Sequence, residues 1–401
     1  MRSTVRRKLI TGLLVVIAIA SIIGWRSYKW SLLSSLGFYP SDLCTRSEDF
    51  YNRGGKLNAK VINNIDRNSN STLLLCIFQE SLKKNDLETV KLLLEDTAKF
   101  DIEADLGFGG TPLFYAQGRE VTQYLVDRGA NVNARSNKGT TPLFSAWKDK
   151  ESTQVLIENG ANVNASSEEG YTPLFSVEDP EVALLLIENG ANANAIAEEG
   201  YNPLFFVANA ETAQLLIRNG ADVNARNSEG QTSLFFARNE EIAQLLIDNG
   251  SKVNVKDEAG GTPLFSAIRK TSSQLLADPL LIGSLYNPEV ARLLIDRGAD
   301  INTKDNFGQT ALFFAEHEET VQLLVDSGVD INNRNNEGQT VLFFDKPKKV
   351  TQLLIDLGSN VNAIDNKGRT PLSCTNNREQ KQILLENGAK HVATTSASER
   401  C

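Results

Sequence analysis

The stretch "NPLFFVANAETAQLLIRNGADVNARNSEGQ" occupies residues 202–231, and close copies precede and follow it along the 401-residue chain. Each copy opens with threonine or asparagine, mostly at steps of 30 or 31 residues, at Thr72, Thr111, Thr141, Thr172, Asn202, Thr232, Thr262, Thr310, Thr340 and Thr370. Two steps are longer, at 39 residues (72 to 111) and 48 residues (262 to 310). A period of this length is typical of proteins built from stacked repeats.

Each copy predicts two helices and a turn. Asn202, like threonine at the other copies, is a good N-cap, because its side-chain oxygen can accept from a free backbone amide, and Pro203 suits the first helical position. Apolar residues at i, i+3 and i+4 within 213–217 predict a second helix with one buried face. Gly220 should end that helix in the left-handed conformation, and a second glycine, Gly230, should close a polar turn before the next copy.

Stacking follows from the size of the repeat. Neither helix can bury its apolar face within one copy, so neighbouring copies must share a core. The sequence therefore predicts an all-α solenoid of about ten stacked helix-turn-helix units. We expect these repeats over residues 72–393, between an N-terminal cap region at 41–71 and a polar tail at 394–401.

The repeats resemble the ankyrin repeat family through "TPLF", "LLI", "NGADVNA" and the glycine-closed turn, over roughly residues 50–393. They differ in being shorter than the family's usual length of about 33 residues. The family's usual Thr-Pro-Leu-His also carries phenylalanine for histidine here, at Phe114, Phe144, Phe175, Phe205, Phe235, Phe265, Phe313 and Phe343. A buried ring contributes about 1.5–3 kcal/mol, which would offset the packing that a shorter first helix loses. We expect a core column; the alternative is a ladder of rings that binds a ligand.

The N-terminus is a different kind of sequence. A basic flank at residues 1–8 precedes 17 uncharged residues at 9–25, and residues 26–40 would form a linker. Seventeen residues is close to the minimum for a membrane-spanning helix, and "AIA" at 18–20 also fits a signal peptidase site. The apolar run continues past that site, which favours an uncleaved signal-anchor. The alternatives are a cleaved signal peptide and a buried globular helix.

The basic flank also predicts an orientation. Cations before the apolar segment should keep the N-terminus in the cytoplasm and place the repeats on the periplasmic, luminal or extracellular side. The alternative is a secreted soluble protein, such as an inhibitor or a host-directed effector.

The charge and the motifs of the chain limit the classes of function that it can have. The net charge is −9, and residues 1–29 carry six cations and no acid, so the remainder carries −9 − 6 = −15. An acidic body argues against nucleic acid as a partner. The chain has no nucleotide-binding loop, no catalytic motif and no Cys-x-x-Cys, and its only histidines are His317 and His391. We expect no catalytic residues, metal, cofactor or small-molecule substrate. The ankyrin resemblance implies a non-catalytic module that binds another protein; the alternative of another class is an enzyme accessory or an enzyme itself.

Four cysteines lie in pairs near the ends of the repeats, at Cys44, Cys76, Cys374 and Cys401. In an oxidising compartment, Cys44–Cys76 and Cys374–Cys401 disulfides would stabilise the terminal repeats, which each lack one neighbour. The alternative is four unpaired thiols.

The resemblance implies partner contacts at the turn tips and at the start of each first helix. Those positions include Trp147, Glu168, Glu169, Tyr171, Glu178, Asp179, Glu198, Glu199 and Tyr201. Carboxylates combined with rigid aromatic rings predict an interface for a partner with a basic surface. The alternative is a solvated acidic face.

The longest step contains an insertion at about 268–287. It is rich in apolar residues, Leu275, Leu276, Leu280, Leu281, Ile282, Leu285 and Tyr286. Either residues 270–277 lengthen the first helix and the rest folds back on neighbouring repeats, or the insertion docks on a partner or a membrane surface.

Overall fold

The computed structural model describes residues 71–96, 100–145, 149–269 and 286–390. Short helices and turns make up these four ranges, which contain no strand. The fold is therefore all-helical, as the repeat pattern predicts. No helix within these ranges is long and apolar enough to cross a membrane, and the predicted segment at 9–25 lies outside them.

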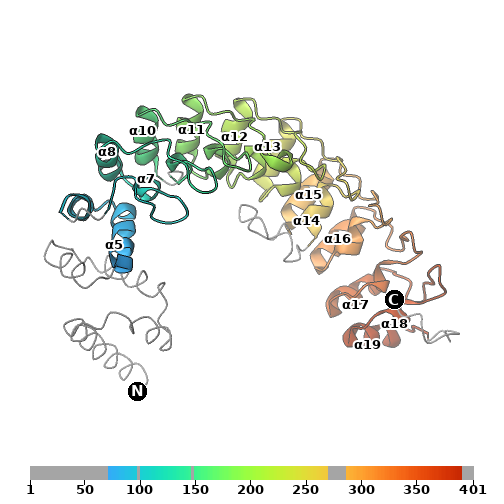
Figure 1. Ribbon diagram of the computed structural model, residues 1–401. Coiled ribbons are helices and arrows are strands. Elements are labelled where there is room, and N and C mark those ends of the chain that lie inside the picture. The colour runs from blue at the N-terminus through green and yellow to red at the C-terminus, as the bar shows by residue number, and fades with distance from the viewer. Residues whose placement is uncertain (1–70, 97–99, 146–148, 270–285, 391–401) are drawn as a thin grey trace, which may run out of the picture. The chain divides into compact units, whose positions relative to one another are not determined.

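The chain divides into two compact units, Met1–Asn162 and Val163–Cys401 (Figure 1). The first unit contains α5 (Ser71–Lys83), α6 (Leu87–Lys91), η1 (Leu92–Asp96), α7 (Pro112–Tyr115), α8 (Arg119–Asp127), α9 (Pro142–Ser145) and α10 (Lys150–Glu158). Here α8 packs against both α6 and α10, so the longer helices stack side by side.

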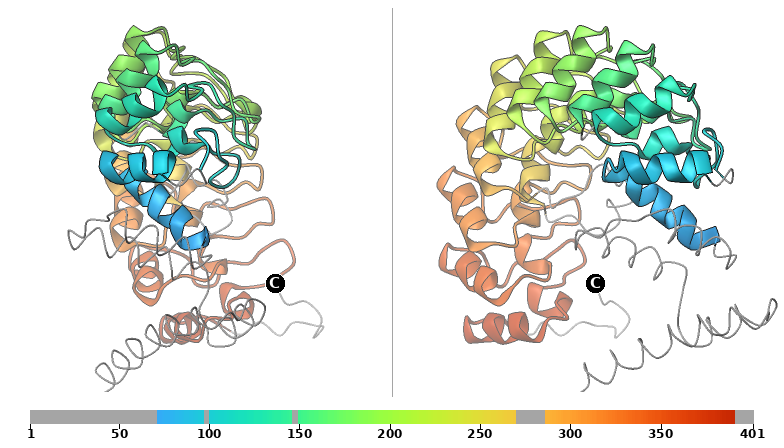
Figure 2. Two further views of the ribbon diagram at one scale, coloured as in Figure 1. Left: turned by 60° about the vertical axis from the view of Figure 1, so that its left-hand side comes forward. Right: turned by 90° about the vertical axis from the view of Figure 1, so that its left-hand side faces the viewer.

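The second unit repeats the same pattern over more copies. Its helices are η3 (Pro173–Ser176), α11 (Pro180–Glu188), η4 (Glu198–Gly200), η5 (Pro203–Phe205), α12 (Ala210–Arg218), η6 (Ser233–Phe236), α13 (Glu240–Asp248), α14 (Pro263–Ile268), α15 (Pro288–Asp296), η8 (Ala311–Phe314), α16 (Glu318–Asp326), η9 (Val341–Phe343), α17 (Lys348–Asp356), α18 (Pro371–Cys374) and α19 (Arg378–Glu386). Within this unit, the longer helices stack along one edge and the turns lie along the other (Figure 2).

From Thr111 onward, the first helix of each repeat is short and begins where the sequence predicts. The prediction is wrong at Thr72, because α5 (Ser71–Lys83) is 13 residues long and includes that threonine. The Asn202 side chain accepts a hydrogen bond from Leu204 N at 3.1 Å, as expected of an N-cap. The threonines at the same position behave differently. Their hydroxyls are buried without a hydrogen-bond partner, at Thr111, Thr232, Thr310 and Thr340. The expectation of side-chain capping is wrong for these residues, because their buried side chains pack in the core.

The phenylalanine column lies in the core, as the sequence predicts. Seven of the eight rings are less than 9% exposed, and Phe144 is half-buried. Four of the rings, Phe175, Phe205, Phe265 and Phe313, also reach the second phenylalanine of the following repeat. Phe205 lies 5.6 Å from Phe236 between ring centroids, and Phe313 lies 5.6 Å from Phe344. Aromatic pairs at this distance stabilise the contact beyond area burial alone, so the column joins neighbouring repeats.

Glycine ends the second helix as expected. Gly220 has φ +89°, in the left-handed region that favours glycine. The turn glycine Gly200 has φ +82°, and a Cβ there would lie 2.9 Å from the carbonyl oxygen of Arg226 in the next repeat. This glycine therefore serves both the turn and the close approach of the neighbouring backbone.

In most of the described repeats, an asparagine near the end of the repeat binds the backbone of the next one. Asn224 Nδ2 donates to the carbonyl oxygen of Gly250 at 2.9 Å, and Asn224 Oδ1 accepts from the amide of Lys252 at 3.0 Å. We call this pair of bonds the asparagine clasp. It recurs at Asn133, Asn164, Asn254, Asn332 and Asn362.

A second set of bonds joins the turn tips. The amide of Glu198 donates to the carbonyl oxygen of Glu169 at 2.8 Å, and Glu258 donates to Glu229 in the same way at 2.8 Å. The tips therefore form a backbone ladder from one repeat to the next. Together with the clasp, this ladder fixes the register of the stack.

The insertion leaves and rejoins the stack at adjacent points. The amide of Asn287, which caps α15, donates to the carbonyl oxygen of Ala267 at 2.8 Å. Helix α14 ends at Ile268, and Arg269 is extended with ψ 126°. Residues 270–277 lie outside the described residues, so both interpretations of the insertion stay predictions.

The structure describes only two of the four cysteines in the predicted disulfides. Cys76 and Cys374 each take part in a disulfide bond. Cys44 and Cys401 lie outside the described residues, so the two pairings stay predictions.

Replacing Asn224 with alanine should destabilise the second unit by about 1–3 kcal/mol, because two hydrogen bonds between repeats are lost at about 0.5–1.5 kcal/mol each. The measurement is urea unfolding followed by circular dichroism. Asn249→Ala is the matched control, since Asn249 Nδ2 bonds only within its own repeat, to Leu245 O at 2.8 Å. Equal losses in the two variants would contradict a special role for the clasp.

Candidate functional site

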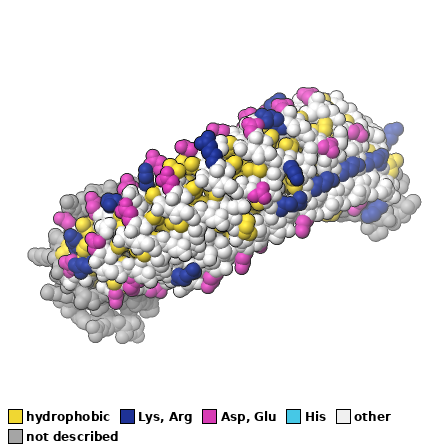
Figure 3. Space-filling view, turned by 90° about the horizontal axis from the view of Figure 1, so that it is seen from above, with side chains coloured by type: hydrophobic (Ala, Val, Ile, Leu, Met, Phe, Trp, Pro, Cys, Tyr) yellow, Lys and Arg dark blue, Asp and Glu magenta, His cyan; other side chains and the backbone are white. Residues whose placement is uncertain are grey.

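Of six predicted carboxylates in the second unit, four lie at the turn tips of two consecutive repeats, and Glu178 and Asp179 lie in the connection between η3 and α11. Glu168, Glu169, Glu178, Asp179, Glu198 and Glu199 are all exposed. The Glu198–Glu169 rung of the backbone ladder brings the two tips together. Asp and Glu side chains are also numerous on the face seen in Figure 3. We call these six residues the acidic tips.

One acidic residue also has a structural role. Asp179 Oδ1 accepts from the amide of Glu181 at 2.8 Å and so caps α11. Glu199 is unusual in another way, because its φ of 59° and ψ of 10° lie in the left-handed region. Non-glycine residues in this region carry some strain, which often marks a functional position.

The two predicted tyrosines are not surface anchors. Tyr201 is 8% exposed and lies edge-on to Phe205 with ring centroids 5.2 Å apart. Tyr171 is half-buried and meets Phe175 in the same geometry at 5.2 Å. Their assignment as exposed aromatic contacts is therefore wrong. Both tyrosines follow a turn glycine, and their rings pack with the phenylalanine column.

Of the residues predicted for the docking insertion, the structure describes only Tyr286. Tyr286 stacks on His317 with centroids 4.2 Å apart, and its hydroxyl lies 3.0 Å from Thr320 Oγ1. Tyr286 therefore packs on the following repeat and does not project as part of a docking loop. Trp147 and the leucines and isoleucine of the insertion lie outside the described residues.

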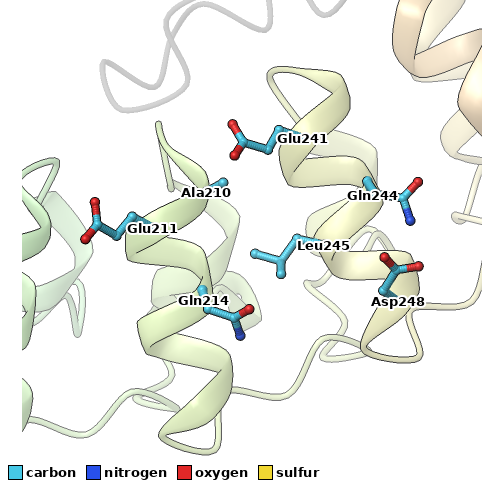
Figure 4. A pocket seen from close by; sticks show the side chains of 7 residues that line it. All are labelled: Ala210, Glu211, Gln214, Glu241, Gln244, Leu245 and Asp248. Atoms are coloured by element: carbon cyan, nitrogen blue, oxygen red, sulfur yellow. The ribbon is translucent and has the colours of Figure 1, made fainter.

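A groove lies between α12 and α13 on the side of the longer helices (Figure 4). Its volume is about 390 Å³, and it is lined by Ala210, Glu211, Gln214, Glu241, Gln244, Leu245 and Asp248. In Figure 4, Leu245 points into the space between the two helices, Glu241 extends from α13 toward α12, and Glu211 extends from the side of α12 that faces away from α13. This site was not predicted from the sequence, because the groove forms only when two repeats are side by side.

One wall of the groove is held by an arginine from the next repeat. Arg297 Nη1 lies 2.9 Å from Asp248 Oδ1, and Arg297 Nη2 donates to Gln244 Oε1 at 2.6 Å. Hydrogen bonds from Arg297 and then Gln244 lower the pKa of the Asp248 carboxyl. The seven lining residues offer carboxylates and amides but no nucleophile. Their chemistry suits a cationic side chain of a partner better than a reacting substrate.

Metal binding has no support in the ranges that the structure describes. No group of three or more His, Cys, Asp or Glu side chains there is arranged to hold an ion.

A buried lysine lies near the C-terminal end of the described repeats. Lys346 is 4% exposed, and its Nζ donates to the carbonyl oxygen of Phe313 at 2.6 Å. Burial lowers the pKa of Lys346 to about 8, and the nearby Glu316 carboxylate only partly opposes this shift. Lys346 therefore bridges two repeats at the cost of burying a charge.

A buried ion pair lies in the same region. Arg369 Nη2 is 2.7 Å from Asp365 Oδ2, and both side chains are almost fully buried. Burial alone would raise the pKa of Asp365, but hydrogen bonds from Arg369 and from nearby amides lower it overall. The pair occupies a turn and serves its structure.

Comparison with known proteins identifies the class. The family model for ankyrin repeats, taken as three copies, matches residues 77–167, 117–196, 174–257, 206–281 and 280–345. These segments together span residues 77–345, which is more than half of the chain. The chain belongs to the ankyrin repeat family, and the resemblance drawn from its sequence is confirmed. This family is generally a non-catalytic scaffold for interactions.

Two individual proteins are similar to parts of this chain. A protein of Rickettsia bellii (strain RML369-C) named for its ankyrin repeats is 37% identical over 87 residues, covering 19% of this chain and 52% of the relative. The chain thus spans about half the length of that relative. The crystal structure of the human ASB11 ankyrin repeat domain is 23% identical with a TM-score of 0.47, covering 55% of this chain and 99% of that one.

Replacing Lys346 with methionine should change how stability depends on pH. In the unfolded chain lysine keeps its proton up to about pH 10.4, and in the folded chain Lys346 loses it near pH 8. Between these values the unfolded state binds more protons, so wild-type stability rises with pH. The free energy of unfolding of the wild type should therefore rise by about 2 kcal/mol relative to that of Lys346→Met between pH 7.5 and pH 9.5.

Urea unfolding at several pH values measures this difference. Lys348→Met is the control, because it removes an exposed lysine two residues away. If the difference in free energy of unfolding between the wild type and Lys346→Met stays constant across this pH range, the lowered pKa is contradicted.

Proposed function

We propose that this chain is a non-catalytic protein-binding module whose acidic tips bind a basic surface on a partner protein. Membership in the ankyrin repeat family supports the protein-binding class. The exposure of all six tip carboxylates, on a ladder that holds neighbouring tips together, is the observation that carries the choice of surface. Complementary charge at an interface accelerates association and selects the partner.

The groove between α12 and α13 adds a second acidic surface in the same unit. Its carboxylates, Glu211 and Glu241, are exposed beside Leu245. A lysine or arginine of the partner could place its aliphatic stem on the leucine and its charge beside Glu241. The groove and the acidic tips therefore suit the same kind of partner.

We further propose that residues 9–25 anchor the chain in a membrane, with the repeats on the non-cytoplasmic side. The basic flank at residues 1–8 and the 17 uncharged residues that follow it support this proposal. The alternative is a secreted protein from which residues 1–20 have been removed.

Reversing charge at the acidic tips should weaken binding. In Glu168→Lys/Glu198→Lys, two new cations face a basic partner, so we expect at least about a tenfold loss of affinity that shrinks as salt is added. The partner would first be captured from detergent-solubilised membranes, and its affinity then measured by calorimetry.

The control variant is Glu240→Lys/Glu319→Lys, which changes net charge equally at exposed helix residues away from the tips. Circular dichroism should be unchanged in both variants. If both bind the partner as the wild type does, the acidic tips are not the interface.

Protease accessibility tests the proposed topology. A protease added to the non-cytoplasmic side of an intact membrane should digest the repeats, and the mature N-terminus should begin at Met1. Repeats that are protected until the membrane is breached would contradict the orientation. A mature chain beginning at Ser21 would instead establish the secreted form.

A further inference from the structure

One position of the repeat carries a cation in four consecutive copies of the second unit. This position follows directly after "VNA" or its equivalent, and it holds Arg226, Lys256, Lys304 and Arg334. All four side chains are exposed. We call these four residues the basic strip. Sequence analysis did not single them out, because they are 30 to 48 residues apart in the chain.

Hydrogen bonds hold the strip in one line. Arg226 Nη2 donates to Lys256 O at 2.6 Å, Lys256 Nζ donates to Lys304 O at 3.1 Å, and Lys304 Nζ donates to Arg334 O at 3.0 Å. Arg334 Nη1 continues the series to Ile364 O at 2.6 Å. Each cation thus reaches along the stack to the backbone of the next repeat. A row of Lys and Arg side chains is visible on the face shown in Figure 3.

The charge of the strip is not neutralised by ion pairs. Across the described ranges, the polar partners of these four side chains are backbone carbonyl oxygens, and none of the four has a carboxylate within 4.0 Å. The nearest acids in sequence are used inside their own turns. Asp257 accepts from Gly261 N at 2.8 Å, and Asp305 accepts from Gln309 N at 2.8 Å. Four aligned cations without counter-charges are an unusual feature in a chain of net charge −9.

Exposed apolar residues bracket the strip. Ile196 and Ile364 occupy the same repeat position on either side of the four cations, and they are 56% and 52% exposed. Phe307, at the turn tip that follows Lys304, is 68% exposed. Large apolar side chains exposed beside a charged row are typical of a contact surface.

We propose that the basic strip binds an acidic, extended segment of a partner protein; this rests on the proposed function as a protein-binding module. Stacked helices lie about 8–10 Å apart, and an extended chain advances about 3.3 Å per residue. Every third residue of the segment therefore faces the next cation. The ligand is a peptide with Asp or Glu at every third position and an apolar residue at each end.

The backbone bonds of the strip favour such a ligand. Because the cationic side chains are already held in line by carbonyl oxygens, less side-chain entropy is lost when a carboxylate approaches. A nucleic acid strand fits less well, because it carries a charge at every nucleotide, and the exposed carboxylates of Glu229, Glu258 and Glu337 at the neighbouring turn tips repel such a continuous charge more than carboxylates at every third residue.

The test uses the full chain in detergent and a fluorescent peptide. The peptide carries four glutamates, one at every third position, and an isoleucine at each end. A scrambled peptide of equal composition is the reference. The strip variant is Arg226→Gln/Lys256→Gln/Lys304→Gln/Arg334→Gln. The control variant removes four other exposed cations, in Arg218→Gln/Lys252→Gln/Arg292→Gln/Lys349→Gln.

The patterned peptide should bind the wild type and the control variant at least about tenfold more tightly than it binds the strip variant. It should also bind the wild type more tightly than the scrambled peptide does. Equal binding of the two peptides, or equal binding by the strip variant, would overturn the proposal. Circular dichroism of all three proteins checks that the stack is intact.

Other occupants give distinct results. Tighter binding of single-stranded DNA than of the peptide would overturn the proposal in favour of a polyphosphate ligand. Self-association in sedimentation experiments that is lost in the strip variant would identify a second copy as the occupant. The acidic-tip variant should still bind the peptide, so loss of tip binding and loss of strip binding are separate outcomes.

Discussion

The asparagine clasp is the interaction on which the other features depend. A single repeat contains a one-turn helix, a helix of about nine residues and a turn, which is too little to bury a core. The clasp at Asn224 fixes the next repeat through both the carbonyl of Gly250 and the amide of Lys252. Because both bonds are to backbone, the register does not depend on which side chains the next repeat carries.

Fixed register turns each repeat position into a column. The phenylalanines then meet ring to ring, as Phe205 meets Phe236, and the core continues from repeat to repeat within a unit. The same constraint lines up exposed positions. Arg226 and Lys256 become neighbours because they share a position in the repeat. A solenoid can therefore change its surface chemistry by point substitutions without disturbing the contacts that hold it together.

The basic strip is confined to the later repeats of the second unit, where exposed carboxylates also lie at the neighbouring turn tips. The acidic tips lie in its first two turns, whereas the basic strip begins at Arg226, one repeat later. Exposed Ile196 marks the boundary, since it holds the strip position in the last acidic repeat. Two surfaces of opposite charge on one scaffold can select different parts of one partner, or different partners.

The sequence by itself determined the period, the helix starts and ends, and the core column. These features depend on local chemistry, such as the freedom of Gly220 at positive φ and the apolar spacing of the second helix. Exposure of the six acidic residues was also predictable, because carboxylates at polar turns rarely find a buried partner.

Only the tertiary structure decided the direction of individual side chains and the contacts between repeats. The buried hydroxyl of Thr232 and the inward ring of Tyr201 were not predictable, because both depend on what the adjacent repeat places against them. The groove beside Leu245 and the basic strip likewise form only when residues 30 or more positions apart are brought together. Local sequence specifies each repeat, but the surface of the stack belongs to pairs of repeats, and stacking geometry alone determines it.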